Sequence, residues 1–190
     1  MYKRQAEFTL EVWDAKLADV GERLRAARRA MLDDMAPILA TAYDAVAQQA
    51  AMVECHYESS WNGPLAEALL TSRDLDVRRG VTTVGPHRDE IHVTLAGAPA
   101  RTHASQGEQR SLALALRLAA DGVIRTVGVA EPVLLLDDVF SELDPNRAGA
   151  LLEALPEGQR ILTTAAGLPS AARPDQVIRV HDSALTLESP

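Results

Sequence analysis

The stretch VLLLDDVFSELDP at residues 133–145 constrains the fold more than any other part of the sequence. Its first four residues, Val133 to Leu136, have no polar face, which is typical of a strand buried on both sides in the middle of a parallel sheet. Asp137 and Asp138 follow at once, so we expect them at the carboxyl end of that strand, the edge at which open α/β sheets bind ligands. The stretch therefore predicts an α/β protein.

Two adjacent carboxylates at such an edge suit a hard divalent cation. One of the two carboxylates can hold Mg²⁺, directly or through water, while the other orients or deprotonates an attacking water. The alternative is that both aspartates simply end a buried strand in a turn. These residues alone leave both interpretations open.

Helical and strand patterns alternate along the rest of the 190-residue chain. Helices are expected from Phe8 to about Met31, from about Asp34, at 63–80, from about Gln106 to Ile124 and from about Pro145 to Leu155; strands are expected at 52–60, 81–86, 90–102, 160–165, 176–180 and 184–188. In the second helix, Asp34 is the expected cap and Pro37 the expected first-turn residue. The alternation predicts a mainly parallel sheet covered on both faces, preceded by a helical hairpin or an arm.

The segment HASQGEQRSLALALRLAA at 103–120 is the second informative stretch. Ser105 and Glu108 have the spacing of a capping box, in which each side chain satisfies an exposed amide of the other residue. That motif does not explain Gly107, which costs a helix about 1 kcal/mol relative to alanine. A glycine in the first turn allows a ligand to approach the backbone closely. The amino terminus of a helix is positive, so phosphate is the ligand that we expect there.

The charge balance restricts the partners. A formal net charge of -8 provides no global attraction to DNA or to an anionic membrane, so any nucleic-acid contact must be local. The best local candidates share one helix with several acidic residues, and a solvated helix face is the favoured interpretation; they are Arg23, Arg25, Arg28 and Arg29. Cys55 is the single cysteine, and no apolar run has the length of a membrane span, so we expect a cytoplasmic protein without a membrane partner.

The two informative stretches together resemble a known ATPase family. SQGEQRSLALALRLA followed by PVLLLDDVFSELD resembles the signature helix, Walker B strand and D-loop of the ABC-type ATPases of the SMC and RecF group. The segments TTVGPHRDEI at 82–91 and LEVWDAKLA at 10–18 narrow the resemblance to the RecF family. The implied fold is the carboxyl-terminal half of an ABC-type P-loop ATPase sheet, at 81–190, with a lobe II-like amino-terminal helical arm, at 1–80.

The resemblance also implies residue roles. Asp137 would be the Walker B carboxylate that supports Mg²⁺, and Asp138 would take the place of the catalytic base, which is usually glutamate in the wider class. The signature loop, Ser105 to Gln109, would reach across an ATP-dependent homodimer to the γ-phosphate of ATP. The D-loop, Ser141 to Asp144, would touch the partner. The implied ATP-binding residues are Ser105, Gln106, Gly107, Glu108, Gln109 and Asp144. Thr163 and Thr164 stand where many relatives place a switch histidine.

A phosphate-binding loop is the part that we do not find. It requires a glycine-rich turn followed by lysine, whereas Lys3 and Lys16, the only lysines, follow Tyr2 and Ala15. We therefore expect the Walker A half to lie outside this chain, which alone should show negligible ATPase activity, and the uncovered sheet to expose apolar surface. The complete protein implied by the resemblance acts in DNA replication, recombinational repair and the SOS response, binding ATP and single-stranded and gapped double-stranded DNA together with RecO and RecR.

Two other functions remain as alternatives. One is a stand-alone, non-catalytic interaction module of the same fold. The other is a metal-dependent hydrolase built on Asp137, Asp138 and His87, which leaves SQGEQ and SELD unexplained. In the sequence GPHRD, His87 and Asp89 suggest a catalytic dyad, but no nucleophile accompanies them, and a hydrogen-bonded turn is the favoured interpretation. The resemblance offers Arg88 an interfacial or phosphate-proximal role.

Overall fold

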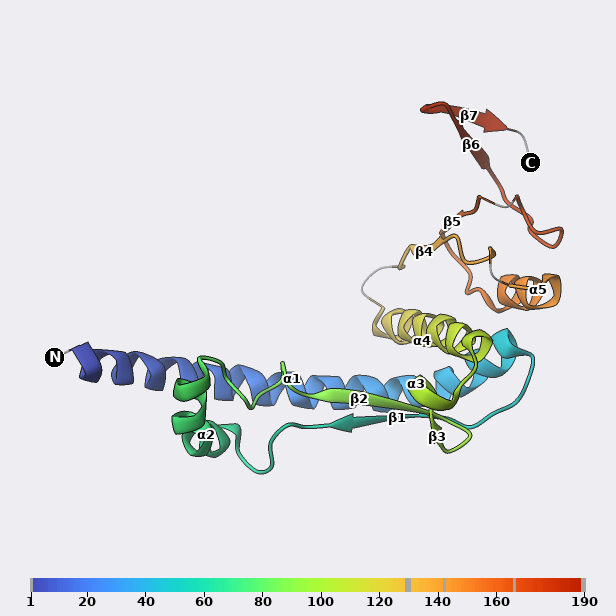
Figure 1. Cartoon of the computed structure of the whole chain (residues 1–190). Coiled ribbons are helices and arrows are strands. Elements are labelled where there is room, and N and C mark those ends of the chain that lie inside the picture. The colour runs from blue at the N-terminus through green and yellow to red at the C-terminus, as the bar shows by residue number, and fades with distance from the viewer. Residues whose placement is uncertain (1, 129–130, 142, 166, 189–190) are drawn as a thin grey trace.

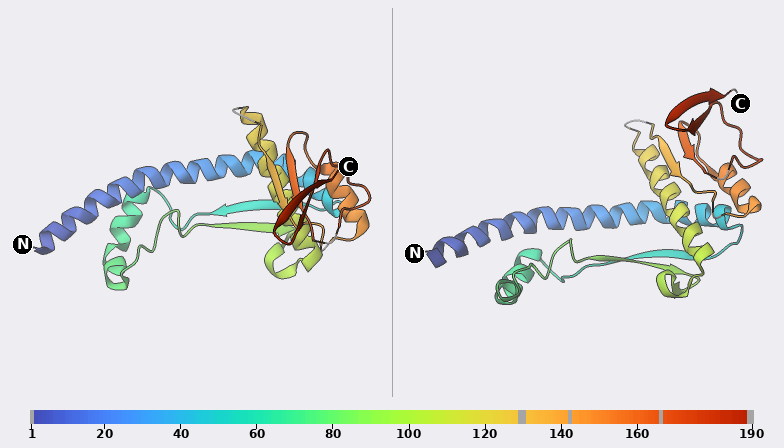
Figure 2. Two further views of the ribbon diagram at one scale, coloured as in Figure 1. Left: turned by 90° about the horizontal axis from the view of Figure 1, so that it is seen from above. Right: turned by 45° about the horizontal axis from the view of Figure 1, so that its top comes forward.

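One long helix is the central structural element of the molecule. A computed structural model describes residues 2–128, 131–141, 143–165 and 167–188, with side chains from residue 9 onward. Helix α1 (Tyr2–Ala47) contains 46 residues, which corresponds to about 70 Å at 1.5 Å per residue. The remaining elements lie along α1 or gather at its carboxyl end (Figures 1 and 2). We call the part along the amino-terminal side of α1 the arm and the part at its carboxyl end the head.

The expected break in this helix does not occur. Asp34 and Pro37 lie inside α1 rather than at the start of a second helix, so that prediction was wrong. Pro37 removes only one intrahelical hydrogen bond, and the residues around it are held by burial. Met35, Leu39 and Tyr43 belong to the larger hydrophobic core, where α1 packs against the helix that begins at Gln106. Tertiary packing therefore keeps the helix continuous through the proline.

A three-stranded antiparallel sheet lies beside α1. Its order is β1 (Val53–Glu58), β2 (Glu90–Leu95) and β3 (Ala98–Pro99). Strand β1 alternates, with Val53 and Tyr57 buried and with Glu54, His56 and Glu58 exposed. Strands β2 and β3 are joined by a tight hairpin in which Ala96 and Gly97 both have positive φ.

The arm is completed by helix α2 (Leu65–Arg79) and the loop after it. Gly80, at φ 67°, ends the helix as expected. The strand expected at 81–86 is absent, because the segment forms turns whose polar groups bind locally. For example, Thr83 donates from both its amide and its hydroxyl to the Asp76 carboxylate. A small core of Trp61, Leu65 and Leu69 holds the arm together.

The head contains the remaining elements, which follow the predicted order except for a short helix, Ala100–His103, at the end of the segment expected as a strand at 90–102. They are α3 (Ala100–His103), α4 (Gln106–Val127), β4 (Leu134–Asp137), α5 (Pro145–Ala154), β5 (Arg160–Thr163), β6 (Val177–His181) and β7 (Ala184–Glu188). Strands β4 and β5 pair in parallel, and β6 and β7 form a separate antiparallel hairpin. The larger core joins α4, α5 and β4 to the carboxyl end of α1.

The chain is a mixed α/β protein, but its sheets are not mainly parallel. Among the described strands, β4 and β5 are the one parallel pair, so the expectation of a larger parallel sheet was wrong for this chain. Leu134 and Leu136 are buried, whereas Leu135 is 68% exposed and Ile161 on the neighbouring strand is 49% exposed. The apolar strand is therefore covered on one face only, and its second face is an exposed apolar surface.

Candidate functional site

Asp137, Asp138 and Thr163 meet at the carboxyl ends of the parallel strands. Asp137 pairs with Thr163 in the strand register, and the Thr163 hydroxyl donates to the Asp137 carboxylate. The Asp138 amide donates to both the carbonyl and the hydroxyl oxygen of Thr163, at 3.1 and 3.0 Å. Thr163 therefore fixes the orientation of the first aspartate and the backbone of the second.

The backbone turns sharply at Asp138. Its φ of 48° lies in the left-handed region, which an aspartate tolerates better than most side chains do. The Asp138 carbonyl accepts from the Ser141 hydroxyl at 2.9 Å, and its carboxylate accepts weakly from the Ala165 amide at 3.4 Å. The turn thus occupies the backbone of Asp138 while its carboxylate stays on the exposed edge of the sheet.

The oxygen donors at this edge suit Mg²⁺ in part. Asp137 and Asp138 are both exposed and supply the hard carboxylate ligands that Mg²⁺ prefers. No group of three or more His, Cys, Asp or Glu side chains in the described part of the chain is arranged to hold a metal ion. Mg²⁺ at Asp137 would therefore draw its other ligands from water and from substrate phosphates, as it does in phosphoryl-transfer sites.

The signature loop begins helix α4 with the predicted capping box. The Ser105 hydroxyl accepts from the Glu108 amide at 3.3 Å, and the Glu108 carboxylate accepts from the Ser105 amide at 2.7 Å. Hydrogen bonding of the Glu108 carboxylate with the Ser105 hydroxyl and amide, with a smaller contribution from Arg147, lowers the pKa of Glu108. The amides of Gln106 and Gly107 remain as first-turn donors without intrahelical partners, at the positive end of the helix.

Gly107 has a specific neighbour that the sequence did not reveal. A Cβ atom at this position would lie 2.7 Å from Nη1 of Arg147, so the glycine makes room for that guanidinium against the signature helix. Nε of Arg147 lies 3.6 Å from a carboxylate oxygen of Asp144. Close approach to Gly107 is thus confirmed, but the approaching group is an arginine of α5. Because 40 residues separate the two positions, no local pattern could have predicted the contact.

Besides Ser105 and Glu108 of the capping box, two more of the expected ATP-binding side chains have structural partners. The side-chain amide of Gln109 donates from Nε2 to the Ala104 carbonyl at 3.0 Å, which connects α4 to the end of α3. Asp144 caps α5 by accepting from the amides of Asn146 and Arg147 at 3.0 and 3.1 Å. Their contact with nucleotide remains a prediction, as it does for Ser105 and Gln106.

The predicted site residues therefore form two clusters. Arg147 brings the signature loop together with Asp144 in one cluster, and Asp137, Asp138 and Thr163 form the other. Within the described residues, no hydrogen bond or ion pair joins the signature loop to the aspartate pair. Of the expected D-loop, Glu142 lies outside the described residues.

The GPHRD segment lies in the arm and forms a hydrogen-bonded turn. His87 Nε2 and Arg88 Nε both contact the Thr82 carbonyl, at 3.0 and 3.1 Å. The Asp89 carboxylate accepts from the Tyr57 hydroxyl and from the Ser60 amide. The geometry thus supports a hydrogen-bonded turn rather than a catalytic dyad. The Asp89 carboxylate instead anchors β1 through Tyr57 and Ser60.

Comparison with known proteins adds the family. No protein-family profile matches the chain. A curated protein of Frankia alni, "DNA replication and repair protein RecF", is 43% identical over an alignment of 173 residues, and the match covers 83% of this chain and 46% of the relative. Two solved structures of the recombination mediator protein RecF in the RecFOR pathway, RecF-ATPrS and RecF-ATP, each match 95% of the chain with a TM-score of 0.77. Their identities are 28% and 27%, and the chain covers 51% and 50% of them.

The chain belongs to the RecF family. It spans about half the length of the RecF proteins that it matches. The mixed α/β fold is that of RecF over nearly the whole chain. None of the helices in the described ranges has the length and hydropathy that crossing a membrane requires.

Proposed function

We propose that this chain supplies the signature and Walker B part of the ATP site of a RecF protein that acts in DNA replication and repair. The observation that carries the proposal is the arrangement of Thr163, Asp137 and Asp138 at the end of the parallel strands. Asp137 is oriented to support Mg²⁺, and Asp138 presents an exposed carboxylate to an attacking water. The Thr163 hydroxyl takes the place of a switch histidine.

The phosphate-holding part comes from elsewhere. In-line phosphoryl transfer requires the β- and γ-phosphates to be fixed, which two carboxylates cannot do. The signature loop offers the amides of Gln106 and Gly107, with the Arg147 guanidinium beside them, as donors for phosphate oxygens. In the proposed assembly, this surface meets the nucleotide that a second subunit holds in an ATP-dependent homodimer.

The proposed partners follow from the relatives. One is called a DNA replication and repair protein, and the solved structures are of a recombination mediator in the RecFOR pathway. From these relatives together with the resemblance of the motifs, we propose ATP-dependent binding of single-stranded and gapped double-stranded DNA, together with RecO and RecR, in the cytoplasm. ATP and Mg²⁺ are the proposed cofactors of the complete protein.

A chimaera tests the function. The chain is fused behind the part of the Frankia alni RecF that it does not cover, and Mg²⁺-dependent ATP turnover is measured with gapped DNA. We expect turnover in the fusion, a loss of about 100-fold or more in Asp138→Ala, and partial retention in Asp138→Glu. Asp175→Asn, which changes an exposed loop aspartate, is the matched control.

The exposed apolar face of β4 and β5 favours a second candidate, a non-catalytic interaction module. Leu135 and Ile161 on that face are open to a protein partner. A folded fusion without ATP turnover would favour this module over the ATPase half-site.

A further inference from the structure

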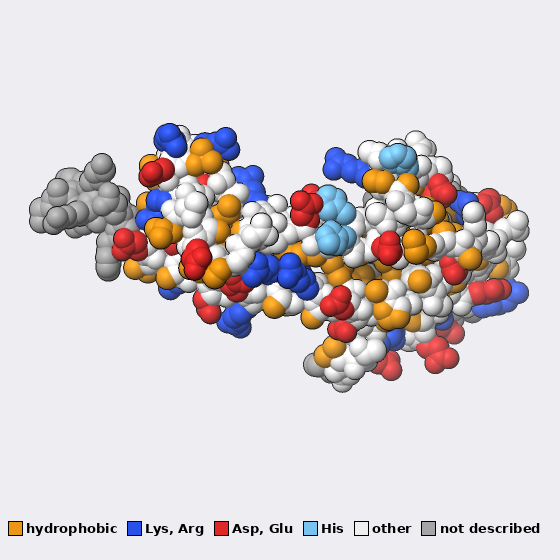
Figure 3. Space-filling model, turned by 90° about the horizontal axis from the view of Figure 1, so that it is seen from below, with side chains coloured by type: hydrophobic (Ala, Val, Ile, Leu, Met, Phe, Trp, Pro, Cys, Tyr) orange, Lys and Arg blue, Asp and Glu red, His pale blue; other side chains and the backbone are white. Residues whose placement is uncertain are grey.

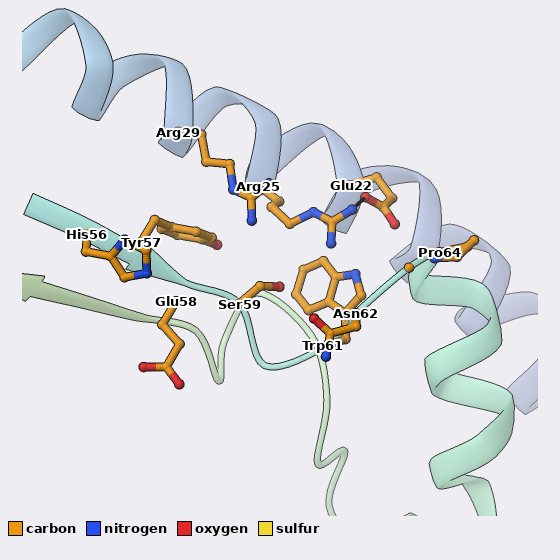
Figure 4. Close-up of a pocket in the computed structure, with 11 residues that line it drawn as sticks. Glu22, Arg25, Arg29, His56, Tyr57, Glu58, Ser59, Trp61, Asn62 and Pro64 are labelled. Atoms are coloured by element: carbon orange, nitrogen blue, oxygen red, sulfur yellow. Dashed lines mark hydrogen bonds and ion pairs between the residues drawn. The ribbon is translucent and has the colours of Figure 1, made fainter.

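A cleft in the arm lies apart from both clusters of the ATP site. It has a volume of about 860 Å³ and opens between α1 and the chain that leads from β1 to α2 (Figure 4). Arg25 and Arg29 of α1 reach toward Tyr57 and Trp61 on the opposite wall, and Ser59 lies between the two rings. Basic side chains also gather over the arm in the view of Figure 3.

Of the four arginines singled out in the sequence of α1, all but Arg23 contact residues outside the helix. The Arg25 guanidinium lies 4.6 Å from the centre of the Trp61 ring, and the Arg29 guanidinium lies 5.7 Å from that of Tyr57. Arg28 donates to the Pro86 carbonyl at 2.6 Å. The expected solvated face was therefore wrong for Arg25 and Arg28, whereas Arg23 is exposed as expected.

The carboxylates near the cleft are already engaged. Glu22 pairs with Arg25, and its second oxygen accepts from the Leu65 amide at 2.8 Å. Glu58 contacts His92 at 2.6 Å and points away from α1 on the other face of β1 (Figure 4). Arg29 has no carboxylate partner among the described residues. Its charge is therefore available to an external anion.

Two donors in the wall have no acceptor. Trp61 is only 4% exposed, yet its indole Nε1 has no hydrogen-bond partner among the described residues, and neither has the Ser59 hydroxyl. Buried polar groups are nearly always bonded, so each of these two requires an acceptor that the chain does not supply. An anion with several oxygens, held by the arginines, supplies acceptors to both.

We propose that this cleft binds the phosphate backbone of a nucleic-acid strand. Guanidinium groups match phosphate oxygens in geometry as well as charge. Arg25 and Arg29 are one helical turn apart, about 6 Å along the axis, so they can contact neighbouring phosphates. The Tyr57 and Trp61 rings are 8% and 4% exposed, too little for bases to stack on them. The contact is thus with phosphate and is independent of sequence.

The choice of nucleic acid over an acidic peptide rests on the proposed function, because the matched relative is a DNA replication and repair protein. The site itself requires neither ATP nor the aspartate pair. The arm can therefore fail as a DNA site while the ATPase proposal stands, and the reverse also holds.

Fluorescence anisotropy of the purified 190-residue chain tests the cleft without ATP. The probes are a fluorescein-labelled 20-nucleotide single strand and the corresponding duplex, each titrated at several salt concentrations. We expect Arg29→Ala to weaken binding about 5- to 10-fold for at least one probe, while Arg23→Ala, which removes the same charge from an exposed position of α1, changes it less than 2-fold. The slope of log K against log salt should fall by about 0.7 for the single strand or about 0.9 for the duplex. The more affected probe identifies the strand type.

Additional variants keep the outcome unambiguous. Arg29→Lys should retain part of the affinity, and Asp175→Asn, at an exposed loop position outside both the cleft and the ATP site, should retain all of it. Circular dichroism checks the fold of every variant. The proposal is overturned if neither probe binds the unmodified chain, if Arg29→Ala leaves binding unchanged, or if Arg23→Ala is equally harmful. It is also overturned if a fluorescein-labelled polyglutamate peptide, but neither nucleic acid, depends on Arg29, because the partner is then an acidic peptide.

Discussion

The arm and the head are held together by different forces. In the head, side chains from α1, α4 and α5 form one large apolar core, and Leu39 and Leu151 are essentially inaccessible to solvent. In the arm, the core contains only three fully buried side chains, and polar contacts do much of the holding. Tyr57 with Asp89 is one such contact, and Arg73 with Asp14 is another.

This difference predicts that the head is more stable than the arm. Burying a leucine contributes about 1.5–3 kcal/mol, whereas a typical hydrogen bond contributes about 0.5–1.5 kcal/mol net. The head can therefore keep Asp137, Asp138 and the signature loop in fixed positions. The arm is held more weakly and presents polar, charged side chains to solvent. We expect perturbations of the head to unfold the chain and equivalent perturbations of the arm to act locally.

Truncation of a core leucine should show the largest difference. Leu39→Ala removes a side chain that is 1% exposed from the large core and should lower the free energy of unfolding by about 2–5 kcal/mol. Leu65→Ala, at an equally buried arm position, should release the arm from α1 while the head stays folded. Urea unfolding and hydrogen exchange measure the two effects. Loss of protection in α4 on Leu65→Ala would show that the two regions unfold together.

A glycine pair gives the next largest effect. A Cβ atom at Gly21 would lie 2.5 Å from Leu65, so Gly21→Ala should destabilise the contact between α1 and α2 by about 1–3 kcal/mol. Gly149 in α5 has open space around it, and Gly149→Ala should stabilise the chain by about 0.4–1 kcal/mol. Thermal unfolding of both variants tests the opposite signs. Equal signs would contradict the packing of α1 on α2.

The polar contacts of the arm predict a smaller effect. Asp89→Asn weakens the bonds to Tyr57 and Ser60 and should destabilise the arm by about 1 kcal/mol. Burial, followed by the hydrogen bond to Asp89, raises the pKa of Tyr57, so the variant should move that pKa back toward the ordinary value of a tyrosine. Ultraviolet difference titration against the unmodified chain detects the shift. Asp74→Asn, at an exposed position of α2, should leave it unchanged.

The signature helix predicts the smallest effect, a pH dependence. Hydrogen bonds from Ser105 lower the pKa of Glu108, so the capping box stabilises the folded chain above the unfolded pKa of that glutamate, and this stability is lost as pH falls through the lowered, folded pKa. Glu108→Gln should remove that part of the acid dependence, and Glu153→Gln, on the exposed side of α5, should not. Urea midpoints between neutral and acidic pH measure it. Identical acid profiles for the unmodified chain and Glu108→Gln would contradict the role of the capping box.

The sequence predicted the features that depend on neighbouring residues. Ser105 with Glu108 marked the start of α4, Gly80 marked the end of α2, and the aspartates followed the apolar strand as expected. Pro37 misled the helix prediction because packing on α4 outweighs one lost hydrogen bond. The contact of Arg147 with Gly107 joins positions 40 residues apart in the chain, which no local pattern records.

The apolar strand β4 also led to a wrong prediction, of burial on both faces. Four apolar residues indicated burial on both faces, but this chain covers only one face of β4, and Leu135 is left exposed. For the arginines of α1 the error was the opposite one: exposure was predicted and contacts were found. Mixed charge indicated a solvated helix face, yet Arg25 and Arg28 find their partners at Trp61 and Pro86, more than 30 residues along the chain.

ATP turnover by the purified 190-residue chain tests the proposed half-site most directly. With saturating ATP and Mg²⁺, and with gapped DNA present, we expect no turnover above that of Asp138→Ala, because Asp137 and Asp138 support hydrolysis only when another segment holds the phosphates. Appreciable turnover by the unmodified chain that Asp138→Ala abolishes would contradict the half-site and show that this chain contains a complete ATPase.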